Sequence, residues 1–591
     1  MRSLIWVLLA SLPAWAQDGA ELFEKNCAGC HKAGSPTRAP LPESLRKLSR
    51  QAIMETLVTG KMLAQAASLT MAERAEIAEY LAGNQPAEVS GGKCESAAAP
   101  LQNLSGWHGW SMDLTNTRFQ SASAAGLDAA KVGGLKLKWA FGYPGAVTAY
   151  GQPSIAGGRL FVGSADGSVY ALDPKSGCTY WIFHAATTVR TAINVGPYGK
   201  GRDAVYFGDG RANVYAVDAQ SGALVWKVHV EEHPLTNITG TPKLYGGRLY
   251  VPVSAGVEEF VATDPKYGCC TARGSVVALD AETGKQIWKT YMIPDPPGPT
   301  RKTKDGVQLM GPSGASVWSS PTVDEKRKVL YVGTGNDHSA PETRYSDAVI
   351  ALDLETGGML WTKQLTSEDR WNVACVSPTP ANCPENAGPD HDIGSSTILV
   401  SIGGGKRLLL VGQKSGVVSA LDPDAKGNIV WQTRVGHGGV LGGVLWGMAA
   451  DAQNLYAPLS DWSQTNPAEG GGLFALRIAT GEKVWHAPPE KPACAGKTGC
   501  TPAQMAPATA IPGLVFSGSM DGHLRAYSTT DGKVIWDFDT LRDFKTVNGV
   551  RAKGGSMSGT GPVAAGGMLF VNSGYAQVGG MSGNVLLAFS E

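Results

Sequence analysis

A pattern of alternating apolar and polar residues recurs through most of the chain. It occurs as YALDPKSGCTYW, YAVDAQSGALVW, VALDAETGKQIW and IALDLETGGMLW, and in looser copies as SALDPDAKGNIVW, FALRIATGEKVW and RAYSTTDGKVIW. Each copy predicts a strand, a tight turn at D-x-x-S/T-G and a second strand that ends in tryptophan. In this turn the aspartate can bond to nearby backbone, and the glycine accepts the positive φ that the turn needs.

The tryptophans recur at intervals of about 40 to 75 residues, which suits a blade of four strands with variable insertions. They are Trp181, Trp226, Trp288, Trp361, Trp431, Trp485 and Trp536. A lone sheet of this kind cannot bury both faces, so we expect the sheets to pack radially into an all-β propeller. We interpret the tryptophans as contacts between neighbouring blades rather than as ligand contacts.

The two ends of this region predict the number of blades. The chain finishes with the strand GNVLLAFS, and no tryptophan strand follows it. The region opens with LKLKWAF, which carries Trp139 and has no partner strand before it. Pairing the two would close the ring, remove an open sheet edge and complete an eighth blade. The sequence therefore predicts an eight-bladed propeller over residues 106–591.

A helical pattern precedes the propeller and surrounds a haem motif. The stretches DGAELFEKN and TMAERAEIAEYLAG read as helices, the second with a capping box at Thr70 and Glu73 and a stop at Gly83. Between them, NCAGCHKAG holds the C-x-x-C-H signature of covalent c-type haem attachment. We therefore expect a small all-α cytochrome c domain over residues 17–83.

The haem ligands follow from this motif. Cys27 and Cys30 would bind the porphyrin through thioethers, and His31 would ligate the iron. Met54, Met62 and Met71 are candidates for the sixth ligand, and each could instead fill the core. In c-type cytochromes this ligand usually comes from the loop before the last helix, which favours Met62. A Met/His pair suits electron transfer rather than oxygen binding.

Residues 1–16 are predicted to be a cleaved signal peptide. Arg2 supplies the positive end, LIWVLLASL the apolar segment, and Ala14-Trp15-Ala16 the cleavage site. The apolar run is too short to span a bilayer, and no later run is long enough. A short membrane anchor is the alternative. We expect an exported protein, periplasmic or secreted, without stable membrane insertion.

Composition supports this organisation. The chain carries 51 basic and 51 acidic residues, a balance that argues against a nucleic acid as partner. Its 76 glycines, 35 prolines and 43% hydrophobic residues suit a turn-rich all-β protein. Residues 84–105, rich in Pro, Gly, Ser and Ala, are predicted to be a linker.

Ten cysteines fit an exported protein, and two of them belong to the haem motif. Cys375 with Cys383, and Cys494 with Cys500, are close enough to close single loops, and the adjacent Cys269 and Cys270 could form a vicinal disulfide. The remaining pair, Cys94 and Cys178, would tie the linker to the propeller. The spacing alone does not determine this connectivity.

The repeat behind a C-x-x-C-H domain resembles the quinohaemoprotein alcohol dehydrogenases, and more closely the cytochrome-type polyvinyl-alcohol dehydrogenases. The most similar stretches are YGCCTARGSVVALD, GPSGASVWSSPTVD, PDHDIGSSTILV, GQKSGVVSALDPD and VNGVRAKGGS. The resemblance covers both domains. It implies an eight-bladed propeller that holds pyrroloquinoline quinone (PQQ) and calcium in its central funnel.

The resemblance assigns the quinone contacts residue by residue. Trp318 in GASVWSS corresponds to the tryptophan beneath the quinone, whose flat rings need an aromatic face to stack on. Arg190 matches an arginine that pairs with a quinone carboxylate. Thr239 matches a threonine that hydrogen-bonds the cofactor, and Lys414 matches the cation beside the quinone carbonyls. The alternatives are an inter-blade tryptophan and solvated polar side chains.

The resemblance also implies a calcium site. Asn336 in YVGTGND corresponds to the asparagine ligand, and Glu258 in SAGVEE to the carboxylate ligand. Glu259 is the alternative if the register is off by one. Calcium prefers hard oxygen ligands of these kinds.

The chain departs from the family at the general base. Asn372 follows Trp371 where many relatives carry a catalytic aspartate, and an amide cannot act as a base. Asp390 and Asp392 in PDHDIGSS follow shortly afterwards. Some relatives place their base at the position of Asp390, so we expect Asp390 to take the proton, with Asp392 second. A pair of aspartates that only caps a loop is the alternative.

Two further departures concern the funnel wall. Ala185 and Ala186 precede Arg190, where methanol dehydrogenases have a vicinal disulfide, whereas Cys269-Cys270 matches the polyvinyl-alcohol enzymes. Leu445 precedes Trp446, where many relatives offer an asparagine to the cofactor.

Together these features predict an enzyme that oxidises an alcohol, a secondary alcohol such as polyvinyl alcohol, with PQQ and calcium. The attached haem c would pass electrons to a soluble periplasmic cytochrome or another acceptor. No dinucleotide-binding fingerprint opens a βαβ unit, which argues against a nicotinamide cofactor. The alternatives are a quinoprotein for another small alcohol, a sugar or an aldehyde, and a non-catalytic propeller scaffold.

Overall fold

The fold comes from a computed structural model of the chain. It describes residues 15–35, 39–48, 50–58, 61–62, 65–66, 69, 71–82, 91–96, 99–101, 104, 106–463, 470–492 and 494–591. The chain divides into two compact units, Met1–Ala87 and Glu88–Glu591, and each is described by itself. Among these residues no helix has the length and apolar character needed to cross a membrane.

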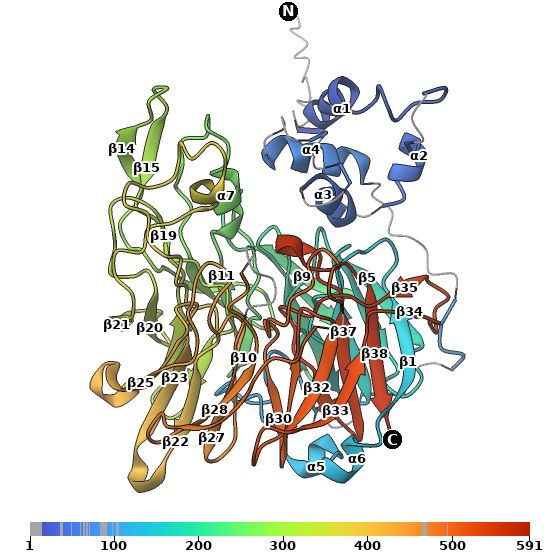
Figure 1. Ribbon diagram of the computed structural model, residues 1–591, viewed down its shortest axis with the longest axis vertical. Coiled ribbons are helices and arrows are strands. Elements are labelled where there is room, and N and C mark those ends of the chain that lie inside the picture. Colours follow the sequence, from blue (N-terminus) through green and yellow to red (C-terminus); the bar gives the residue numbers. More distant parts are fainter. Residues whose placement is uncertain are drawn as a thin grey trace, which may run out of the picture. The chain divides into compact units, whose positions relative to one another are not determined.

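The first unit is helical (Figure 1). It consists of α1 (Trp15–Asn26), α2 (Pro42–Leu45), α3 (Arg50–Val58) and α4 (Met71–Leu81). Helices α1 and α4 correspond to the two predicted helices. They can pack closely because Gly19 has no side chain, and a Cβ there would collide with the backbone of Glu76. Phe23, Ile53 and Ile77 are buried between the helices. Thr70 and Gly83, the predicted cap and stop, lie outside the described residues.

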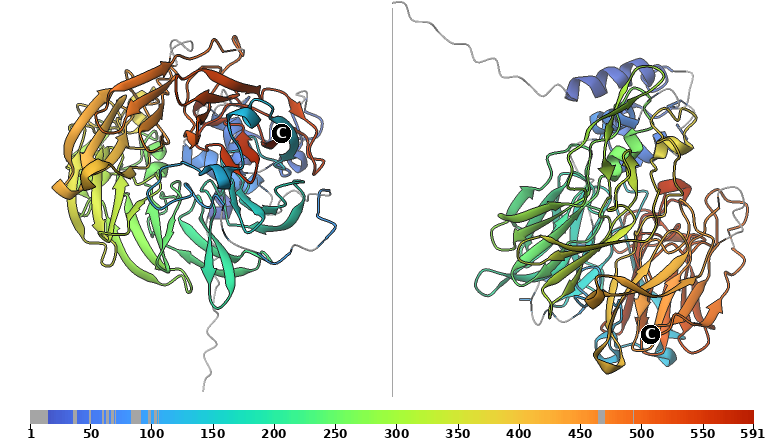
Figure 2. Two further views of the ribbon diagram at one scale, coloured as in Figure 1. Left: turned by 90° about the horizontal axis from the view of Figure 1, so that it is seen from below. Right: turned by 90° about the vertical axis from the view of Figure 1, so that its left-hand side faces the viewer.

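The second unit contains eight four-stranded antiparallel sheets arranged around a common centre (Figure 2, left). The first four in chain order are formed by β2 (Ser154–Ala156), β3 (Arg159–Gly163), β4 (Ser168–Leu172), β5 (Thr179–His184); β6 (Asn194–Tyr198), β7 (Arg202–Gly208), β8 (Asn213–Asp218), β9 (Leu224–His229); β10 (Lys243–Tyr245), β11 (Arg248–Val253), β12 (Ser275–Asp280), β13 (Gln286–Tyr291); and β17 (Thr322–Asp324), β18 (Val329–Gly333), β20 (Ala348–Asp353), β21 (Met359–Gln364).

The last four sheets have the same construction. They are formed by β22 (Ile398–Ser401), β23 (Arg407–Gly412), β24 (Val417–Asp422), β25 (Asn428–Arg434); β26 (Ala449–Ala450), β27 (Asn454–Pro458), β28 (Leu473–Arg477), β29 (Lys483–Ala487); β30 (Thr509–Ile511), β31 (Leu514–Gly518), β32 (His523–Ser528), β33 (Val534–Asp539); and β36 (Val563–Ala565), β37 (Met568–Ser573), β38 (Val585–Ser590), β1 (Lys136–Gly142).

Short elements connect the sheets. They are helices α5 (Ala122–Ala125), α6 (Ala129–Val132) and α7 (Gly256–Val261), strand pairs β14 (Gly298–Lys302) with β15 (Gln308–Gly311), β16 (Ser313–Gly314) with β19 (Asp337–Ser339) and β34 (Asp543–Phe544) with β35 (Ala552–Lys553), and 3-10 turns η1 (Val373–Val376), η2 (Gly403–Gly405), η3 (Pro423–Ala425) and η4 (Gln577–Gly579).

The ring closes as predicted. The first strand of the unit, β1, pairs antiparallel with the last strand, β38, with Leu137 opposite Phe589 and Gly142 opposite Val585. The closing sheet therefore takes three strands from the C-terminal end and one from the N-terminal end, and the eight-bladed all-β propeller is confirmed.

The repeat tryptophans join neighbouring sheets. Trp181 donates its indole N–H to the Ala219 carbonyl of the next sheet at 3.1 Å, and Trp536 donates to Leu135 at 3.2 Å across the closure of the ring. Each described turn glycine lies against a ring: Gly222 has φ +75°, and a Cβ there would come within 2.8 Å of Trp181. The motif glycine is thus needed for the turn and for the contact with the neighbouring blade.

A segment over residues 107–120, here called the strap, runs past the inner edge of every sheet. It hydrogen-bonds the first strand of each sheet, or the residue beside it, at Ile155, Ile193, Lys243, Val323, Leu399, Ala450, Ala510 and Ala564. The buried Arg118 anchors it, with its guanidinium 4.6 Å above the Trp110 ring. The repeat pattern did not predict this segment, because the strap is not itself a repeat.

Eight cysteines form four disulfides, and all four agree with the predicted pairing. They are Cys94–Cys178, Cys269–Cys270, Cys375–Cys383 and Cys494–Cys500. The first fastens part of the predicted linker to the propeller, where the Cys94 N–H donates to the Thr179 carbonyl at 3.1 Å. The C-terminal part of the linker is therefore attached to the edge of β5.

Candidate active site

The predicted quinone and calcium residues lie in loops at one end of the ring. In an antiparallel four-stranded blade, the loop between the second and third strands and the loop to the next blade lie at the same end. Arg190, Thr239, Trp318 and Asp390 lie in loops between blades, and Lys414 lies in a loop between second and third strands. Topology alone thus brings these distant positions to one face.

A narrow cavity lies between these loops, and aromatic rings form much of its wall. Trp318 and Trp446 meet edge to face with ring centroids 4.9 Å apart. A Cβ at Gly394 would collide with the Trp318 ring, so glycine is required there. The Arg190 guanidinium lies 4.2 Å from the Trp446 ring centre. Thr239 and residues of the strap and neighbouring loops complete the lining, including Trp110, Gln152, Thr241, Ser319, Ser320 and Gly559.

Several buried polar atoms of this wall have no hydrogen-bond partner among the described residues. They are Arg190 Nη2, Thr239 Oγ1, Trp318 Nε1, Ser319 Oγ and Ser320 Oγ. An unsatisfied buried donor costs about 1–3 kcal/mol, and native structures tolerate few of them. Their concentration around one cavity indicates a polar ligand, and a quinone with several carboxylate and carbonyl oxygens fits this set of donors.

A buried ion triad lies beside the cavity. Lys414 Nζ is 2.8 Å from Asp390 Oδ1 and 3.1 Å from Asp392 Oδ2, and 6.0 Å from the Trp318 ring centre. Burial raises the pKa of the Asp390 carboxyl well above its ordinary value, although Lys414 opposes the effect. Burial acts to lower the pKa of Lys414, but Asp390 and Asp392 outweigh it and raise that pKa above its usual value. The two carboxylates thus favour the charged form of Lys414 next to the aromatic wall.

Glu259 and Asn336 adjoin this triad. Burial and the charge of Asp392 raise the pKa of Glu259 to about 8, against the opposing effect of Lys414. The Asn336 backbone N–H donates to Asp392 Oδ1 at 2.8 Å, and its side-chain amide donates to the Trp371 carbonyl at 2.6 Å. This second bond leaves the amide oxygen of Asn336 as the group that can act as a ligand.

Glu258, the predicted carboxylate ligand, has a different role. It is fully buried, and its carboxylate accepts hydrogen bonds from the Tyr267 hydroxyl at 2.6 Å, the Thr271 N–H at 2.7 Å and the Ala272 N–H at 2.6 Å. These bonds fix the loop that follows the Cys269–Cys270 disulfide. The adjacent Glu259 has its Oε2 3.9 Å from His338 Nε2, and the charges of Asp392 and Lys414 act on its pKa.

Asn372 is a structural residue, which explains why no aspartate stands there. Its side-chain N–H groups donate to the His338 and Asn382 carbonyls at 2.9 and 3.0 Å, and its Oδ1 accepts from Ala374 at 3.0 Å. A carboxylate could not donate to the two carbonyls. The buried disulfide Cys269–Cys270 lies beside it, with Cys269 Sγ 3.9 Å from the amide.

The loop that carries Asp390 is held by another aspartate. Asp369 Oδ1 accepts from the Asp390 N–H at 2.9 Å, and Asp369 Oδ2 accepts from the His391 N–H at 2.6 Å. Asp369 therefore caps the loop that carries Asp390, while Asp392 itself accepts the backbone N–H of Asn336. Leu445 is buried in the apolar wall beside Trp446. Ala186 donates its N–H to the Tyr215 hydroxyl at 2.9 Å.

Several residues of this site could not be predicted from the sequence. They are Trp110, Asp337, Asp347, Asp369, Gly394 and, as a wall residue, Trp446. Burial raises the pKa of Asp337 to about 8 and that of Asp347 well above its ordinary value. No regular spacing marks these residues, since they come from the strap and from three different connections: β18 to β20, β21 to β22, and β25 to β26. Within the described part of the chain, no group of three or more His, Cys, Asp or Glu is arranged to hold a metal by itself.

The first unit holds its haem motif on one helical turn. The His31 N–H donates to the Cys27 carbonyl at 3.1 Å, which continues α1 past its end. The buried His31 ring donates from Nδ1 to the Pro40 carbonyl at 2.8 Å, so Nε2 remains for iron. This second contact was not predicted, since Pro40 belongs to no motif.

Met62 lies partly buried against the helical core, and Met54 lies on α3. Arg74 of α4 fastens the loop that carries Met62: its guanidinium donates to the Leu57, Ala66 and Leu69 carbonyls at 3.3, 2.7 and 3.0 Å. Met71 is the first residue of α4. The position of Met62 inside this fastened loop agrees with its predicted place, while its role as iron ligand stays a prediction.

Family models match both units. The model "Glucose/ethanol/alcohol dehydrogenase, beta-propeller domain" matches residues 107–389, and the model "Cytochrome C oxidase, cbb3-type, subunit III" matches residues 14–81. The model "Outer membrane protein assembly factor BamB" matches residues 414–549 and 475–591. The last match reflects shared blades, whereas the first two match the catalytic class and the haem domain.

Close relatives extend over nearly the whole chain. A polyvinylalcohol dehydrogenase of a Pseudomonas species is 42% identical, covering 97% of this chain and 93% of the relative. A polyvinylalcohol dehydrogenase of a Sphingopyxis species is 39% identical, covering 98% and 94%. Among solved structures, a europium-containing methanol dehydrogenase superposes with a TM-score of 0.60 at 18% identity, covering 82% of this chain and 98% of that one, and it supports the fold alone.

These matches, together with the predicted and observed architecture, identify the catalytic class. The two relatives align with 97% and 98% of this chain, which includes both units, and at this identity they share its family. The chain belongs to the PQQ-dependent quinohaemoprotein alcohol dehydrogenases, in the branch of the polyvinyl-alcohol dehydrogenases.

Proposed function

We propose that this enzyme uses PQQ and calcium to oxidise secondary alcohols, including those of polyvinyl alcohol, and passes the electrons through haem c to an external periplasmic cytochrome. The observation that carries the proposal is the Lys414–Asp390–Asp392 triad, which borders a cavity whose wall contains unpaired hydrogen-bond donors. Relatives at 39 to 42% identity are named for polyvinyl alcohol, which supports this substrate class.

Four predicted residues suit the quinone. Trp318 offers an aromatic face, Arg190 and Thr239 offer unpaired donors, and Lys414 offers a positive charge beside them. When bound, PQQ supplies a carbonyl carbon that accepts hydride from the alcohol. The residues around it would orient the substrate and exclude water. Lys414 would stabilise negative charge at the quinone oxygens.

We assign the calcium ligands to Glu259 and Asn336. Glu259 thus takes the place of the predicted ligand Glu258. The Glu258 carboxylate already accepts three short hydrogen bonds, whereas Glu259 Oε2 lies 3.9 Å from His338 Nε2 and the charges of Asp392 and Lys414 act on its pKa. Two protein oxygens are few for calcium, which takes six to eight, so oxygens of the bound quinone would complete the site. This agrees with the absence of a protein-only metal cluster among the described residues.

Asp390 would accept the hydroxyl proton of the alcohol, with Asp392 as the second candidate. Its burial raises its pKa, which makes its carboxylate a stronger base, and Asp369 holds its backbone in place. General-base help of this kind typically contributes about 10²–10⁴ in rate. Asn372 takes no part in this step, because both of its amide hydrogens are used on carbonyls.

Haem c would carry the electrons out. Cys27 and Cys30 suit the thioethers, His31 suits one axial position through Nε2, and Met62 suits the other. The predicted signal peptide, residues 1–16, and the four disulfides favour the periplasm. Residues 1–14 lie outside the described residues.

Reconstitution with PQQ and calcium tests the proposal. Purified protein loaded with both would be mixed with a secondary alcohol, polyvinyl alcohol, a sugar and an aldehyde, and the ferrous haem spectrum followed. We expect rapid haem reduction by the secondary alcohol and by the polymer. Haem reduction by the sugar or the aldehyde alone would assign the enzyme to that substrate class instead. Haem that stays oxidised with every substrate would favour a non-catalytic scaffold.

A further inference from the structure

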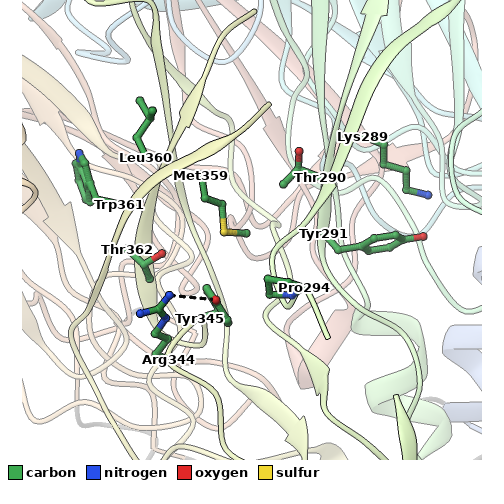
Figure 3. A pocket seen from close by; sticks show the side chains of 10 residues that line it. All are labelled: Lys289, Thr290, Tyr291, Pro294, Arg344, Tyr345, Met359, Leu360, Trp361 and Thr362. Carbon is green, nitrogen blue, oxygen red and sulfur yellow. Dashed lines mark hydrogen bonds between the residues drawn. The ribbon is translucent and has the colours of Figure 1, made fainter. Parts of the chain in front are cut away.

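Neighbouring blades meet along their fourth strands through the repeat tryptophans. Figure 3 shows the residues around a groove between β13 and β21, and Trp361 of β21 is one of them. The Trp361 ring packs on the blade that follows, where a Cβ at Gly427 would come within 2.8 Å of it. Contacts of this kind hold the ring of blades together.

A contact of another kind joins two neighbouring blades beside the candidate active site. Asp461 lies in the loop between β27 and β28, and its carboxylate accepts three backbone N–H groups from the connection between β25 and β26. The donors are His437 at 2.5 Å, Gly438 at 3.1 Å and Gly443 at 2.7 Å. They belong to the segment GHGGVLGG, residues 436–443, here called the glycine loop.

The residues on either side of Asp461 bind the same loop. The Ser460 hydroxyl and the Trp462 N–H both donate to the Leu441 carbonyl. The Ser460 N–H donates to the Gly443 carbonyl at 2.9 Å. Asp461 itself has φ +42°, a conformation that a residue with a side chain seldom adopts. Such strain persists only where many contacts fix the backbone, and it is found most often at functional sites.

The glycine loop packs against the turn that carries Lys414. The Gly439 N–H donates to the Lys414 carbonyl at 3.1 Å. The Val444 N–H, directly after the loop, donates to the Gln413 carbonyl at 3.0 Å. A Cβ at Gly443 would come within 2.5 Å of both carbonyl oxygens, so only glycine fits there. The position of the glycine loop therefore determines the position of the Lys414 backbone.

We propose that Asp461 is a positioning residue for the reaction and acts on Lys414 through the glycine loop. The chain continues from this loop into Trp446 of the cavity wall, so the same carboxylate holds a segment that leads to the cation and to an aromatic ring. The inference rests on the proposed function, which assigns Lys414 to negative charge on the quinone. Such a cation has to be in place before the reaction, since a misplacement of about 1 Å can cost about 10²-fold in rate.

Asp461→Ala tests this role, and Asp451→Ala is the matched control. Asp451 belongs to the same blade, and its carboxylate also accepts three hydrogen bonds. The donors are the Gln453 N–H at 2.8 Å, the Asn454 N–H at 2.7 Å and the Tyr456 hydroxyl at 2.6 Å. Asp451 lies in the turn between β26 and β27, at the opposite end of the blade from the loop between β27 and β28. Both substitutions should therefore lower the melting temperature, but only Asp461→Ala should affect the active site.

Amide hydrogen exchange of the full-length protein, with no PQQ added, is the first measurement. We expect Asp461→Ala to speed exchange about tenfold in residues 436–446 and 413–416, because these segments open more easily once the three bonds are lost. Asp451→Ala should leave the exchange of both segments unchanged. Unchanged exchange of residues 413–416 in Asp461→Ala would overturn the proposal.

The kinetics of the enzyme loaded with PQQ and calcium are the second measurement. We expect Asp461→Ala to lower kcat for a secondary alcohol about tenfold to a hundredfold, with little change in KM, because the cation acts on charge that develops during the reaction. Asp461→Asn keeps one oxygen for Gly438 and Gly443 and should retain more activity.

Equal kcat in wild type and Asp461→Ala would overturn the proposal. An equal loss of kcat in Asp451→Ala would overturn it too, since the effect would then be one of general stability. Haem that stays oxidised in the wild type with every alcohol would instead count against the proposed function. In that case hydrogen exchange would still show whether Asp461 holds the turn of Lys414.

Discussion

The two candidate redox sites of this chain are built in opposite ways. The haem motif occupies five consecutive residues, Cys27 to His31, on one continuation of α1, and a single backbone carbonyl orients the histidine. The quinone site draws on loops from several blades, from Arg190 to Trp446, and its charges are balanced among side chains that are far apart in sequence. Substitutions far from the haem motif should therefore leave the haem site intact, whereas the quinone site depends on the conformation of many loops at once.

The strongest test of this contrast removes the central cation of the assembled site. Lys414→Met should lower kcat about 10²–10³-fold, the usual effect of losing a group that stabilises developing charge. It should also lower the melting temperature, because Asp390 and Asp392 would be left buried without their partner.

Haem content and the oxidised haem spectrum should not change in Lys414→Met. Lys414→Arg is the control, since it keeps the charge and should retain more activity. Haem loss in Lys414→Met would show that the two sites are less independent than their construction suggests.

The adjacent glutamates test whether neighbours in sequence share a role. Glu259→Gln should raise the calcium concentration for half-maximal activation by about 10–100-fold, a typical effect at a metal site, with little change in melting temperature. Glu258→Gln should instead lower the free energy of unfolding by about 1–3 kcal/mol, because its single amide oxygen can accept from Thr271 or from Ala272 but not from both. Calcium titration and thermal melts of both variants give the answer, and the reverse pattern would restore Glu258 as the ligand.

A third test addresses the local site. Arg74→Gln should loosen the loop around Met62, since it loses up to three hydrogen bonds to carbonyls, and each bond from a charged group contributes about 1.5–3 kcal/mol. We expect the absorption band of Met-ligated ferric haem to weaken, while kcat for reduction of an artificial acceptor by the propeller stays unchanged. An intact band in Arg74→Gln would mean that Met62 is placed by other contacts or is not the ligand.

The smallest expected effect concerns the position where the family has its aspartate. Asn372→Asp should lower the free energy of unfolding by about 1–3 kcal/mol, because a carboxylate cannot donate to the His338 and Asn382 carbonyls. Chemical denaturation measures this loss. A gain in kcat would show that position 372 can still act as the base.

Much of the architecture could be predicted because its signals are local. The turn Asp173 to Gly177 and the docking of Trp181 recur with each repeat, so blade count and ring closure follow from counting copies. The disulfides were predictable for a similar reason, since three of the four pairs lie within nine residues of each other.

The site was only partly predictable, because its remaining features depend on loop conformation. Whether Glu258 or Glu259 faces the triad depends on how α7 sits on the Thr271–Ala272 backbone, and a one-residue change in a helix turns the side chain by about 100°. The Asp369 carboxylate accepts from the backbone N–H of Asp390, and Pro40 offers its own carbonyl to His31, and such contacts with backbone groups leave no residue pattern.

The strap has a consequence for the order in which this molecule can be completed. Residues 107–120 leave the ribosome before any blade exists, yet Ala564, the last of their partners, belongs to the closing blade. Strand β1 likewise waits for β38. Both closures depend on β36 to β38, so a nascent chain has an unsealed centre until these strands have been made, and a premature stop within them would prevent both closures.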